Sequence, residues 1–344
     1  MGTTTHNIYN SDSRDMSMVP DKSVSLIITS PPYPMIEMWD NMFIAEDNSI
    51  KDDLSSGQSF SAFRKMHLIL NETWRECDRV LMDNGFICIN IGDATRTVND
   101  SFQLFSNHTQ IINFFSDLGY SVLPDIHWRK QSNAPNKFMG SGMYPAGAYV
   151  TYEHEYILIF RKGVKRQFSQ AEKALRQKSA FFWEERNVWF SDLWDIKGTS
   201  QILTQTKATR ERNASFPFEI PYRLVNMYSA EGDTVLDPFT GLGTTNLACL
   251  ASQRNSIGFE IDCELASLAR ASIMESSSFV NTVINNRLLR HIDFINSLPD
   301  EKRKKCYKNT PHGFDVKTRQ EIDIKIDKVS DIHQENDTIV CLYA

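Results

Sequence analysis

The chain has 344 residues, of which 41% are hydrophobic, and it carries a formal net charge of −6. That length is enough for one large domain or two smaller ones with a sizeable core. No run of residues approaches the ~18 apolar positions that a membrane-spanning helix needs, and the first residues lack a basic segment followed by an apolar one. We therefore expect a cytoplasmic protein with neither a transmembrane helix nor a secretory signal.

The hydrophobic pattern predicts alternating strands and helices along most of the chain. In chain order these are a strand at 24–29, a helix at 60–82, a strand at 86–91, a helix at 109–118, strands at 121–128 and 156–160, a helix at 216–230, a strand at 234–237, a helix at 244–252, a strand at 256–260 and a helix near 263–276. Such alternation is typical of an α/β fold, here a doubly wound and mostly parallel Rossmann-like sheet.

Two segments interrupt this alternation. Residues 164–205 are basic and rich in aromatic side chains, and they read as an inserted module. Residues 125–212 as a whole contain 15 Lys and Arg against 9 Asp and Glu, whereas the chain on either side is acidic. A polyanionic partner binds such a local patch of cations, although a drift of this size can also arise by chance. Residues 278–344 read as a peripheral extension of unknown role.

The six cysteines are scattered and form no C-x-x-C pair. Paired spacing is what zinc sites require, so the sequence predicts buried reduced thiols and no metal site.

A glycine-containing turn joins the strand at 234–237 to the helix at 244–252. It reads Asp-Pro-Phe-Thr-Gly-Leu-Gly-Thr-Thr over residues 237–245. Glycine allows a tight turn and close approach to a ligand, and the helix that follows offers free N–H groups. Glu260, at the end of the next strand, can accept hydrogen bonds from both hydroxyls of a ribose. A purely structural turn is the alternative interpretation.

The kind of cofactor follows from what this turn lacks. It has no G-K-[ST] sequence and no third glycine of a G-x-G-x-x-G pattern, so nothing indicates a pyrophosphate. S-adenosylmethionine, which carries ribose, amino and carboxylate groups, suits the turn better.

A second distinctive sequence, Ser30-Pro31-Pro32-Tyr33, follows the strand at 24–29. Two prolines fix the backbone and remove two N–H donors, so Ser30 Oγ and the Pro31 carbonyl can act as acceptors for the hydrogens of an exocyclic amine. The Tyr33 ring can stack on an extruded base. A double proline that merely ends a strand is the alternative.

Together, the two sequences resemble the catalytic and cofactor motifs of the DNA amino-methyltransferases. The catalytic motif comes first here, which resembles the permuted β group of bacterial restriction–modification enzymes, of the N4-cytosine type. The resemblance covers roughly residues 6–275 and includes the passages at 79–93, 128–158 and 216–224. Residues 212–215 depart from it, because Arg-Asn-Ala-Ser stands where the family often has His-Pro-Ala.

The resemblance implies a role for several residues. Catalysis is assigned to Ser30, Pro31, Pro32 and Tyr33, and cofactor binding to Asp12, Asp237, Phe239, Gly241, Gly243, Thr244 and Glu260, with Asp12 touching the adenine amino group unless it is a simple turn residue. DNA contacts are assigned to Arg129, Lys130, Asn136 and Lys137.

The expected organisation is a catalytic half at 1–163, a target-recognition region at 164–205 assisted by loops within 129–149, an S-adenosylmethionine-binding half at 206–277 and the extension at 278–344. The expected partner is double-stranded DNA, with no membrane involved. A cognate restriction endonuclease acting on the same site and a homodimer are further partners that the resemblance suggests.

Three other functions compete with methylation of cytosine N4. An N6-adenine methyltransferase of the same group usually has Asp or Asn in place of Ser30. A C5-cytosine methyltransferase needs a nucleophilic cysteine, usually after proline, and the chain has no Pro-Cys pair. A non-enzymatic DNA- or nucleotide-binding protein would be expected to have lost Ser30 or the two glycines.

Overall fold

The structure, a computed structural model, describes residues 2–130, 139–197 and 216–344. Within them lie ten strands of one sheet: β1 (Gly2–Tyr9), β2 (Val24–Thr29), β3 (Leu81–Ile91), β6 (Ser121–Arg129), β9 (His154–Arg161), β10 (Leu193–Trp194), β11 (Thr234–Asp237), β12 (Asn255–Phe259), β15 (Val329–Glu335) and β16 (Thr338–Tyr343). Their order is β10-β6-β9-β3-β2-β11-β12-β1-β16-β15. The central strands, from β3 to β1, are parallel, whereas β9 and β16 run antiparallel to their neighbours.

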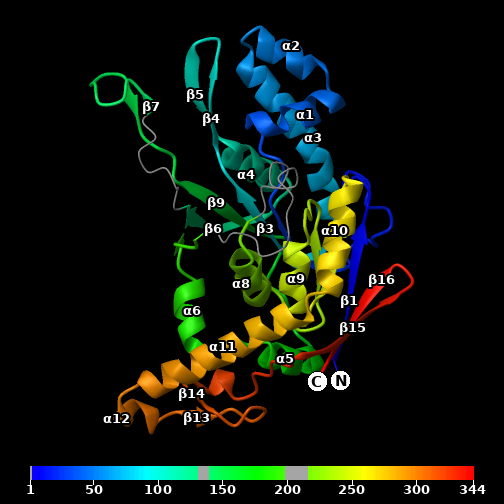
Figure 1. Ribbon diagram of the computed structural model, residues 1–344, viewed down its shortest axis with the longest axis vertical. Helices are drawn as coiled ribbons and strands as arrows, with labels where there is room; N and C mark the ends of the chain where they lie inside the picture. Colours follow the sequence, from blue (N-terminus) through cyan, green and yellow to red (C-terminus); the bar gives the residue numbers. More distant parts are fainter. Residues whose placement is uncertain (1, 131–138, 198–215) are drawn as a thin grey trace.

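Helices cover both faces of this sheet (Figure 1). They are α1 (Asp40–Glu46), α2 (Ser49–Ser55), α3 (Ser59–Val80), α4 (Asn107–Asp117), α5 (Gln170–Lys178), α6 (Trp183–Trp189), α8 (Glu219–Tyr228), α9 (Thr244–Leu250), α10 (Cys263–Met274), α11 (Ser277–Ser297) and α12 (Asp300–Arg303), with short 3-10 turns η1 (Glu37–Trp39) and η2 (Arg319–Glu321). None of the helices in these residues combines the length and the apolar character that a membrane crossing requires.

The two helical layers follow from the alternation of side chains along the strands. All six residues of β2 are buried. Ile27 packs in the same core as Phe63 of α3 and Phe115 of α4, whereas its neighbours Leu26 and Ile28 pack with α8, α9 and α10. A strand buried on both sides reads as a continuous apolar run. The predicted α/β fold with a large, mostly parallel sheet is confirmed, although β9 and β16 add antiparallel pairs that were not predicted.

The predicted elements are found with small changes at their ends. The largest change is at the predicted helix 60–82, which stops at Val80, so that β3 begins at Leu81. Asn84 has a positive φ of 76°, and the pairing of β3 with β2 jumps from Leu81 to Phe86. The Asn84-Gly85 pair therefore marks a bulge inside the strand, where the sequence predicted a helix end.

Two small hairpins project from the sheet beside the ends of β3 and β6 (Figure 1). One pairs β4 (Ala94–Val98) with β5 (Ser101–Phe105), and the other pairs β7 (Met139–Gly140) with β8 (Ala148–Tyr149). The rings of Phe102 and Tyr149 stack with centroids 4.6 Å apart and so join the hairpins. Both hairpins lie at the edge of the sheet that carries the functional loops described below.

The inserted segment is tied to the main sheet. It forms α5, α6 and β10, and β10 pairs with β6. The aromatic side chains that marked this segment in the sequence are largely packing residues, because Phe182, Trp189 and Trp194 are buried in the main core. Residues 198–205 of the predicted module lie outside the described residues.

The expectation of a peripheral extension at 278–344 is wrong for its final strands. β16 pairs antiparallel with β1 from Gly2–Tyr343 to His6–Ile339, and β15 completes the edge. Without β16, β1 would expose a row of unpaired N–H and C=O groups. The missed signal was the Asn336-Asp337 turn, with Asn336 at a φ of 54°, directly before the apolar run Ile339–Tyr343. The remainder of the extension contains α11, α12 and the small pair β13 (Tyr307–Lys308) and β14 (Asp315–Val316).

The cysteine prediction is confirmed in part. All six are free thiols; four are buried, but Cys263 is exposed and Cys306 is half-buried.

Candidate active site

A cavity of about 370 Å³ opens at the carboxyl ends of the parallel strands β1, β2, β11 and β12. Ligands bind at this edge in open α/β sheets, and the volume lies within the usual range for small-molecule sites. Both motifs found in the sequence contribute to its wall. The predicted site residues that line it are Asp12, Ser30, Pro31, Pro32, Asp237, Phe239, Gly241, Thr244 and Glu260.

Asp237 connects the two motifs. Its carboxylate accepts hydrogen bonds from Thr29 Oγ1 at 2.7 Å and Thr245 Oγ1 at 2.6 Å, and from the Phe239 N–H at 3.1 Å. Thr29 directly precedes Ser30, so this one side chain fixes the Ser30-Pro31-Pro32-Tyr33 loop against the glycine turn. Burial raises the pKa of Asp237 to about 6, although the three hydrogen bonds act in the opposite direction.

Glu260 lies across the glycine turn. Its carboxylate accepts the N–H of Gly241 at 2.9 Å and that of Asp262 at 3.0 Å. Burial raises the pKa of Glu260, while these backbone hydrogen bonds lower it. Gly241 has a φ of 53°, a left-handed conformation that glycine adopts without strain. Each carboxylate oxygen has further lone pairs for a ligand's hydroxyl groups.

Gly243 does not line the cavity, in contrast to its predicted role. It is the N-cap of α9 with a φ of 80°, and a Cβ placed on it would lie 3.3 Å from Ala269 Cβ. The second glycine is therefore required for the turn and for packing against α10.

Asp12 lines the cavity but is engaged by a cation that the sequence pattern did not reveal. Arg14 donates from Nε to Asp12 Oδ2 at 2.9 Å and also pairs with Glu46 of α1 at 2.5 Å. Burial acts to raise the pKa of Asp12, but the hydrogen bonds and charge of Arg14 outweigh it, and the pKa is lowered. Asp12 is thus held as a carboxylate that can accept a further N–H.

The cavity wall also suits a ligand with a flat apolar part. Trp39 and Met42 from η1 and α1 face the side formed by Phe239, Phe259 and Leu265. Ser11 Oγ, on the same wall, is buried without a hydrogen-bond partner in the described residues. An adenosine fits such a combination of apolar faces, a carboxylate and an available hydroxyl.

Ser30 reaches a buried polar cluster on the side of β3 and β9. Its Oγ lies 3.0 Å from the Tyr33 hydroxyl, which donates to Glu155 Oε2 at 3.0 Å. Asn90 Nδ2 donates to the Tyr33 hydroxyl at 2.8 Å and to Glu155 Oε2 at 2.7 Å. Lys130 forms an ion pair with the other oxygen of Glu155. Tyr33 is not among the described residues that line the cavity. It contacts Ser30 through its hydroxyl group.

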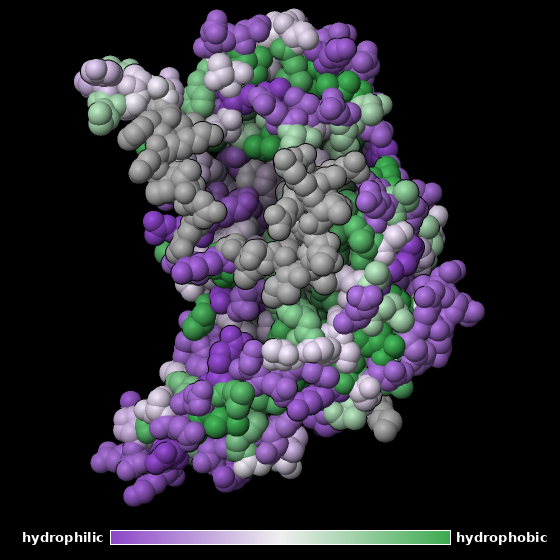
Figure 2. Space-filling model, viewed as in Figure 1, coloured by the Kyte–Doolittle hydropathy of each residue, from purple (hydrophilic) through white to green (hydrophobic). Residues whose placement is uncertain are grey.

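Only two of the four residues predicted to contact DNA lie within the described part of the chain. Arg129 and Lys130, at the end of β6, are exposed, and Arg129 pairs loosely with Glu153 at 3.6 Å. Asn136 and Lys137 lie outside the described residues. The adjacent β7–β8 hairpin carries Met143 and Tyr144, which are 88% and 78% exposed. Figure 2 shows pale and light-green atoms at this tip, at the upper left of the view.

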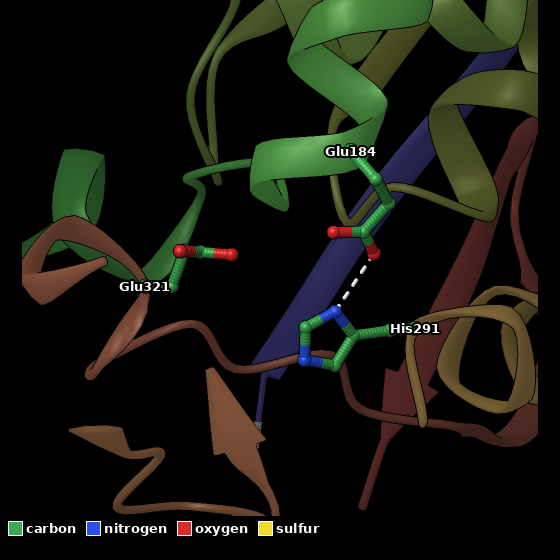
Figure 3. A group of neighbouring side chains, drawn as sticks. All are labelled: Glu184, His291 and Glu321. Carbon is green, nitrogen blue, oxygen red and sulfur yellow. Dashed lines mark hydrogen bonds and ion pairs between the residues drawn. The ribbon is translucent and has the colours of Figure 1, made fainter. Parts of the chain in front are cut away.

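A second cluster of titratable groups lies away from the cavity, where the inserted segment meets the extension (Figure 3). Ligand atoms of Glu184, His291 and Glu321 lie within 4.8 Å of one another. However, His291 bonds Glu184 through Nδ1 at 2.7 Å and the Asp315 carbonyl through Nε2 at 2.9 Å, and Glu321 accepts from the Trp183 and Thr318 N–H groups. Both ring nitrogens of His291 and both oxygens of Glu321 are already engaged, whereas Glu184 Oε2 is buried without a partner among the described residues. A doubly donating His291 indicates an ion pair with Glu184 instead of a metal ligand.

This ion pair predicts a pH dependence of stability. Burial lowers the pKa of His291, but Glu184 and the Asp315 carbonyl outweigh it, and the pKa is raised above its usual 6.5. The charged form therefore stabilises the fold fully below pH 6.5, and this contribution disappears as the pH rises through the raised pKa. We expect His291→Gln to lower the free energy of unfolding by about 1–3 kcal/mol in mildly acidic buffer and by less in alkaline buffer. Urea unfolding over a pH series measures this, and an equal loss at every pH would contradict it.

The chain is similar to known DNA methylases over most of its length. The family model for DNA methylase matches residues 24–271. The type II methyltransferase M.MthZI of Methanothermobacter thermautotrophicus is 50% identical over 326 residues, covering 94% of this chain and 90% of that protein. M.MjaI of Methanocaldococcus jannaschii is 48% identical, covering 79% and 92%. The solved structure of TTHA0409 from Thermus thermophilus, a proposed DNA modification methylase complexed with S-adenosyl-L-methionine, is 30% identical with a TM-score of 0.59, covering 77% and 92%.

Proposed function

The chain belongs to the DNA methylase family, and on that premise we propose that it methylates the exocyclic N4 of cytosine in double-stranded DNA. As a member of this family it is an S-adenosylmethionine-dependent DNA methyltransferase, and its two 48–50% identical relatives are type II methyltransferases. We therefore place it in a type II restriction–modification system.

The observation that carries this proposal is the meeting of the two motifs in one cavity. Ser30 and Pro31 line the same cavity as Phe239 and Glu260, and Asp237 bonds to both loops. S-adenosylmethionine, when bound, supplies an electrophilic methyl group. The protein must then hold a planar amine so that its lone pair, otherwise delocalised into the base, points at that methyl group. We propose that Ser30 Oγ and the Pro31 carbonyl accept the two amine hydrogens.

The base must leave the duplex, because its amine otherwise lies within the stack. We propose that Glu260 holds the ribose of the cofactor, Asp12 the adenine amino group, and Asp237, Phe239, Gly241 and Thr244 the remaining polar and apolar parts. Gly243 supports this arrangement through the geometry of the turn.

The choice of cytosine over adenine rests on Ser30, because the adenine enzymes of this group usually begin the same motif with Asp or Asn. Incubating the protein with duplex DNA and labelled S-adenosylmethionine, then separating the nucleosides by mass spectrometry, tests it. Labelled N4-methylcytosine is the expected product. N6-methyladenine would establish the alternative, and cofactor binding without methylation of any duplex would favour a non-enzymatic binding protein.

For DNA recognition we propose loops within 129–149 together with residues 164–205. The support is the basic composition of this region and the position of Arg129 and Lys130 at the end of β6, which the pairing of β6 and β9 places at the same edge of the sheet as the carboxyl end of β3. A cognate endonuclease and a homodimer are also parts of the proposal. Long-read sequencing of DNA from an expressing cell would identify the target sequence and the modified base.

One substitution tests the placement of this interface. We expect Arg129→Ala to weaken DNA binding about equally for all sequences and to reduce the slope of log affinity against log salt by about 1, as expected for the loss of one phosphate contact. Fluorescence anisotropy at several salt concentrations measures the slope. Lys302→Ala is the matched control, because α12 lies at the opposite end of the molecule (Figure 1). A loss with Lys302→Ala and none with Arg129→Ala would move the interface to the extension.

A further inference from the structure

We propose that Glu155 is a positioning residue for the methyl transfer: through Tyr33 it orients the Ser30 hydroxyl and finally accepts the proton that the methylated amine releases. This inference rests on the proposed function and extends it to residues that no motif identified. Glu155 has no place in the cavity wall, so it acts on the substrate only through the chain Ser30–Tyr33–Glu155.

Three strands bring this chain together. Tyr33 follows β2, Asn90 lies near the end of β3, and Glu155 lies near the start of β9, which is antiparallel to β3. Glu155 pairs in register with Trp128 of β6, two residues before Lys130. The start of β9 therefore lies at the same edge as the carboxyl ends of β2, β3 and β6. Glu155 is 7% exposed, and its carboxylate is reached by Tyr33, Asn90 and Lys130.

The carboxylate fixes the direction of every hydrogen bond in the chain. An ionised carboxylate only accepts, so the Tyr33 hydroxyl donates to Glu155. Tyr33 can then only accept from Ser30, and the Ser30 hydroxyl donates to Tyr33 across their 3.0 Å contact. The two hydrogens of Asn90 Nδ2 are taken by Tyr33 and Glu155 at 2.8 and 2.7 Å, while Ser30 Oγ lies 3.5 Å away. Ser30 Oγ therefore keeps its lone pairs for the cavity, where they can accept a hydrogen bond from the amine.

The packing holds the chain in this arrangement. A Cβ added to Gly92 would lie 3.1 Å from Tyr33 Cε2 and 3.2 Å from Glu155 Cγ, so the two side chains occupy the space beside a residue without one. The ammonium group of Lys130 pairs with the Glu155 oxygen that does not contact Tyr33. Burial, with the negative charge of Glu155, raises the pKa of Tyr33 well above its usual value, which keeps its hydroxyl protonated.

The proton and the electrons balance along this route. The amine nitrogen forms a bond to the methyl carbon with its lone pair, while the carbon–sulfur bond breaks and leaves its electron pair on sulfur. The nitrogen, now positively charged, gives a proton to Ser30 Oγ. Ser30 passes its own proton to Tyr33, and Tyr33 passes its own to Glu155 Oε2. The base ends neutral and Glu155 ends as a carboxylic acid beside Lys130.

A double-mutant cycle on the full-length protein tests this chain. We expect Glu155→Gln and Tyr33→Phe each to lower the single-turnover methylation rate by about 10- to 100-fold, with the affinity for S-adenosylmethionine changed by less than about twofold. In the Tyr33→Phe background, Glu155→Gln should lower the single-turnover rate by less than about a further threefold, because the hydrogen-bond chain is already broken. Asp83→Asn, which removes an exposed carboxylate that pairs with Lys22 near the start of β3, is the control for an ion pair lost away from the cavity.

The proposal would be overturned if the rate losses of the two substitutions multiplied in the double variant. A wild-type rate for Tyr33→Phe would overturn it as well. Tyr33→Phe retains the ring and its packing, so it remains a valid test even if Glu155→Gln folds poorly. Rates are taken per cofactor-binding molecule, so that loss of fold does not imitate loss of the relay. If the wild-type protein methylates DNA but the rate losses of the two substitutions multiply, only the proton relay is rejected. A wild-type protein that methylates no duplex rejects the proposed function itself, and this inference with it.

Discussion

Ser30→Ala is expected to lower the single-turnover rate of DNA methylation by about 30- to 1000-fold, which corresponds to about 2–4 kcal/mol of transition-state stabilisation. Ser30 Oγ lines the cavity and is held by Tyr33. Removing it takes away one of the two acceptors that direct the amine. Cofactor affinity should stay unchanged, because the residues proposed to hold the cofactor come from other loops.

Rapid-quench methylation assays and calorimetric titration with S-adenosylmethionine on the same preparation separate these effects. Ser23→Ala is a suitable control, since Ser23 is an exposed serine that also bonds within a proline turn, to the Pro20 carbonyl at 2.7 Å. A wild-type rate per folded molecule would mean that Ser30 only stabilises its turn. Lost cofactor binding would instead place Ser30 in the cofactor site.

The second large effect is expected from Glu260→Ala, which should weaken S-adenosylmethionine binding by about 30- to 1000-fold, or about 2–4 kcal/mol. Two losses combine in this variant. The ribose hydroxyls lose a charged acceptor, and the Gly241 N–H loses the carboxylate that holds the glycine turn at 2.9 Å.

Calorimetry measures the affinity, and thermal unfolding of the cofactor-free protein reports any damage to the turn. Glu275→Ala, an exposed glutamate just after α10, controls for the loss of negative charge. An unchanged affinity would remove Glu260 from the site, whatever happens to stability.

Much of the fold could be predicted because its central strands are buried on both faces. Such strands appear as uninterrupted apolar runs, and β2 was predicted with its observed bounds at Val24–Thr29. The position of the cavity followed from the same pattern, since the loops after neighbouring parallel strands must meet at one edge. The residues of the two motifs can therefore be grouped from the amino-acid sequence alone.

What could not be predicted depends on contacts between distant positions. Glu155 and Asn90 carry no local signature, because their partnership arises only from the antiparallel register of β9 on β3. Arg14 was missed for the same reason, since its partner Glu46 comes from α1. β1 was missed because its sequence is mostly polar, and its place in the sheet depends on partners that come much later in the chain.

The place of β1 between β12 and β16 has a consequence for how the protein is made. His6 bonds Ser256, 250 residues away, and Thr4 bonds Tyr343, 339 residues away. At a synthesis rate of roughly 5–20 residues per second, β1 leaves the ribosome roughly 20–70 s before β16 can pair with it. Until then one edge of β1 lacks its partner, and its threonine-rich sequence keeps that edge soluble in water. Completion of this side of the sheet is therefore a late step of folding, and newly made protein should become protease-resistant at its first residues only after residues 338–343 have left the ribosome.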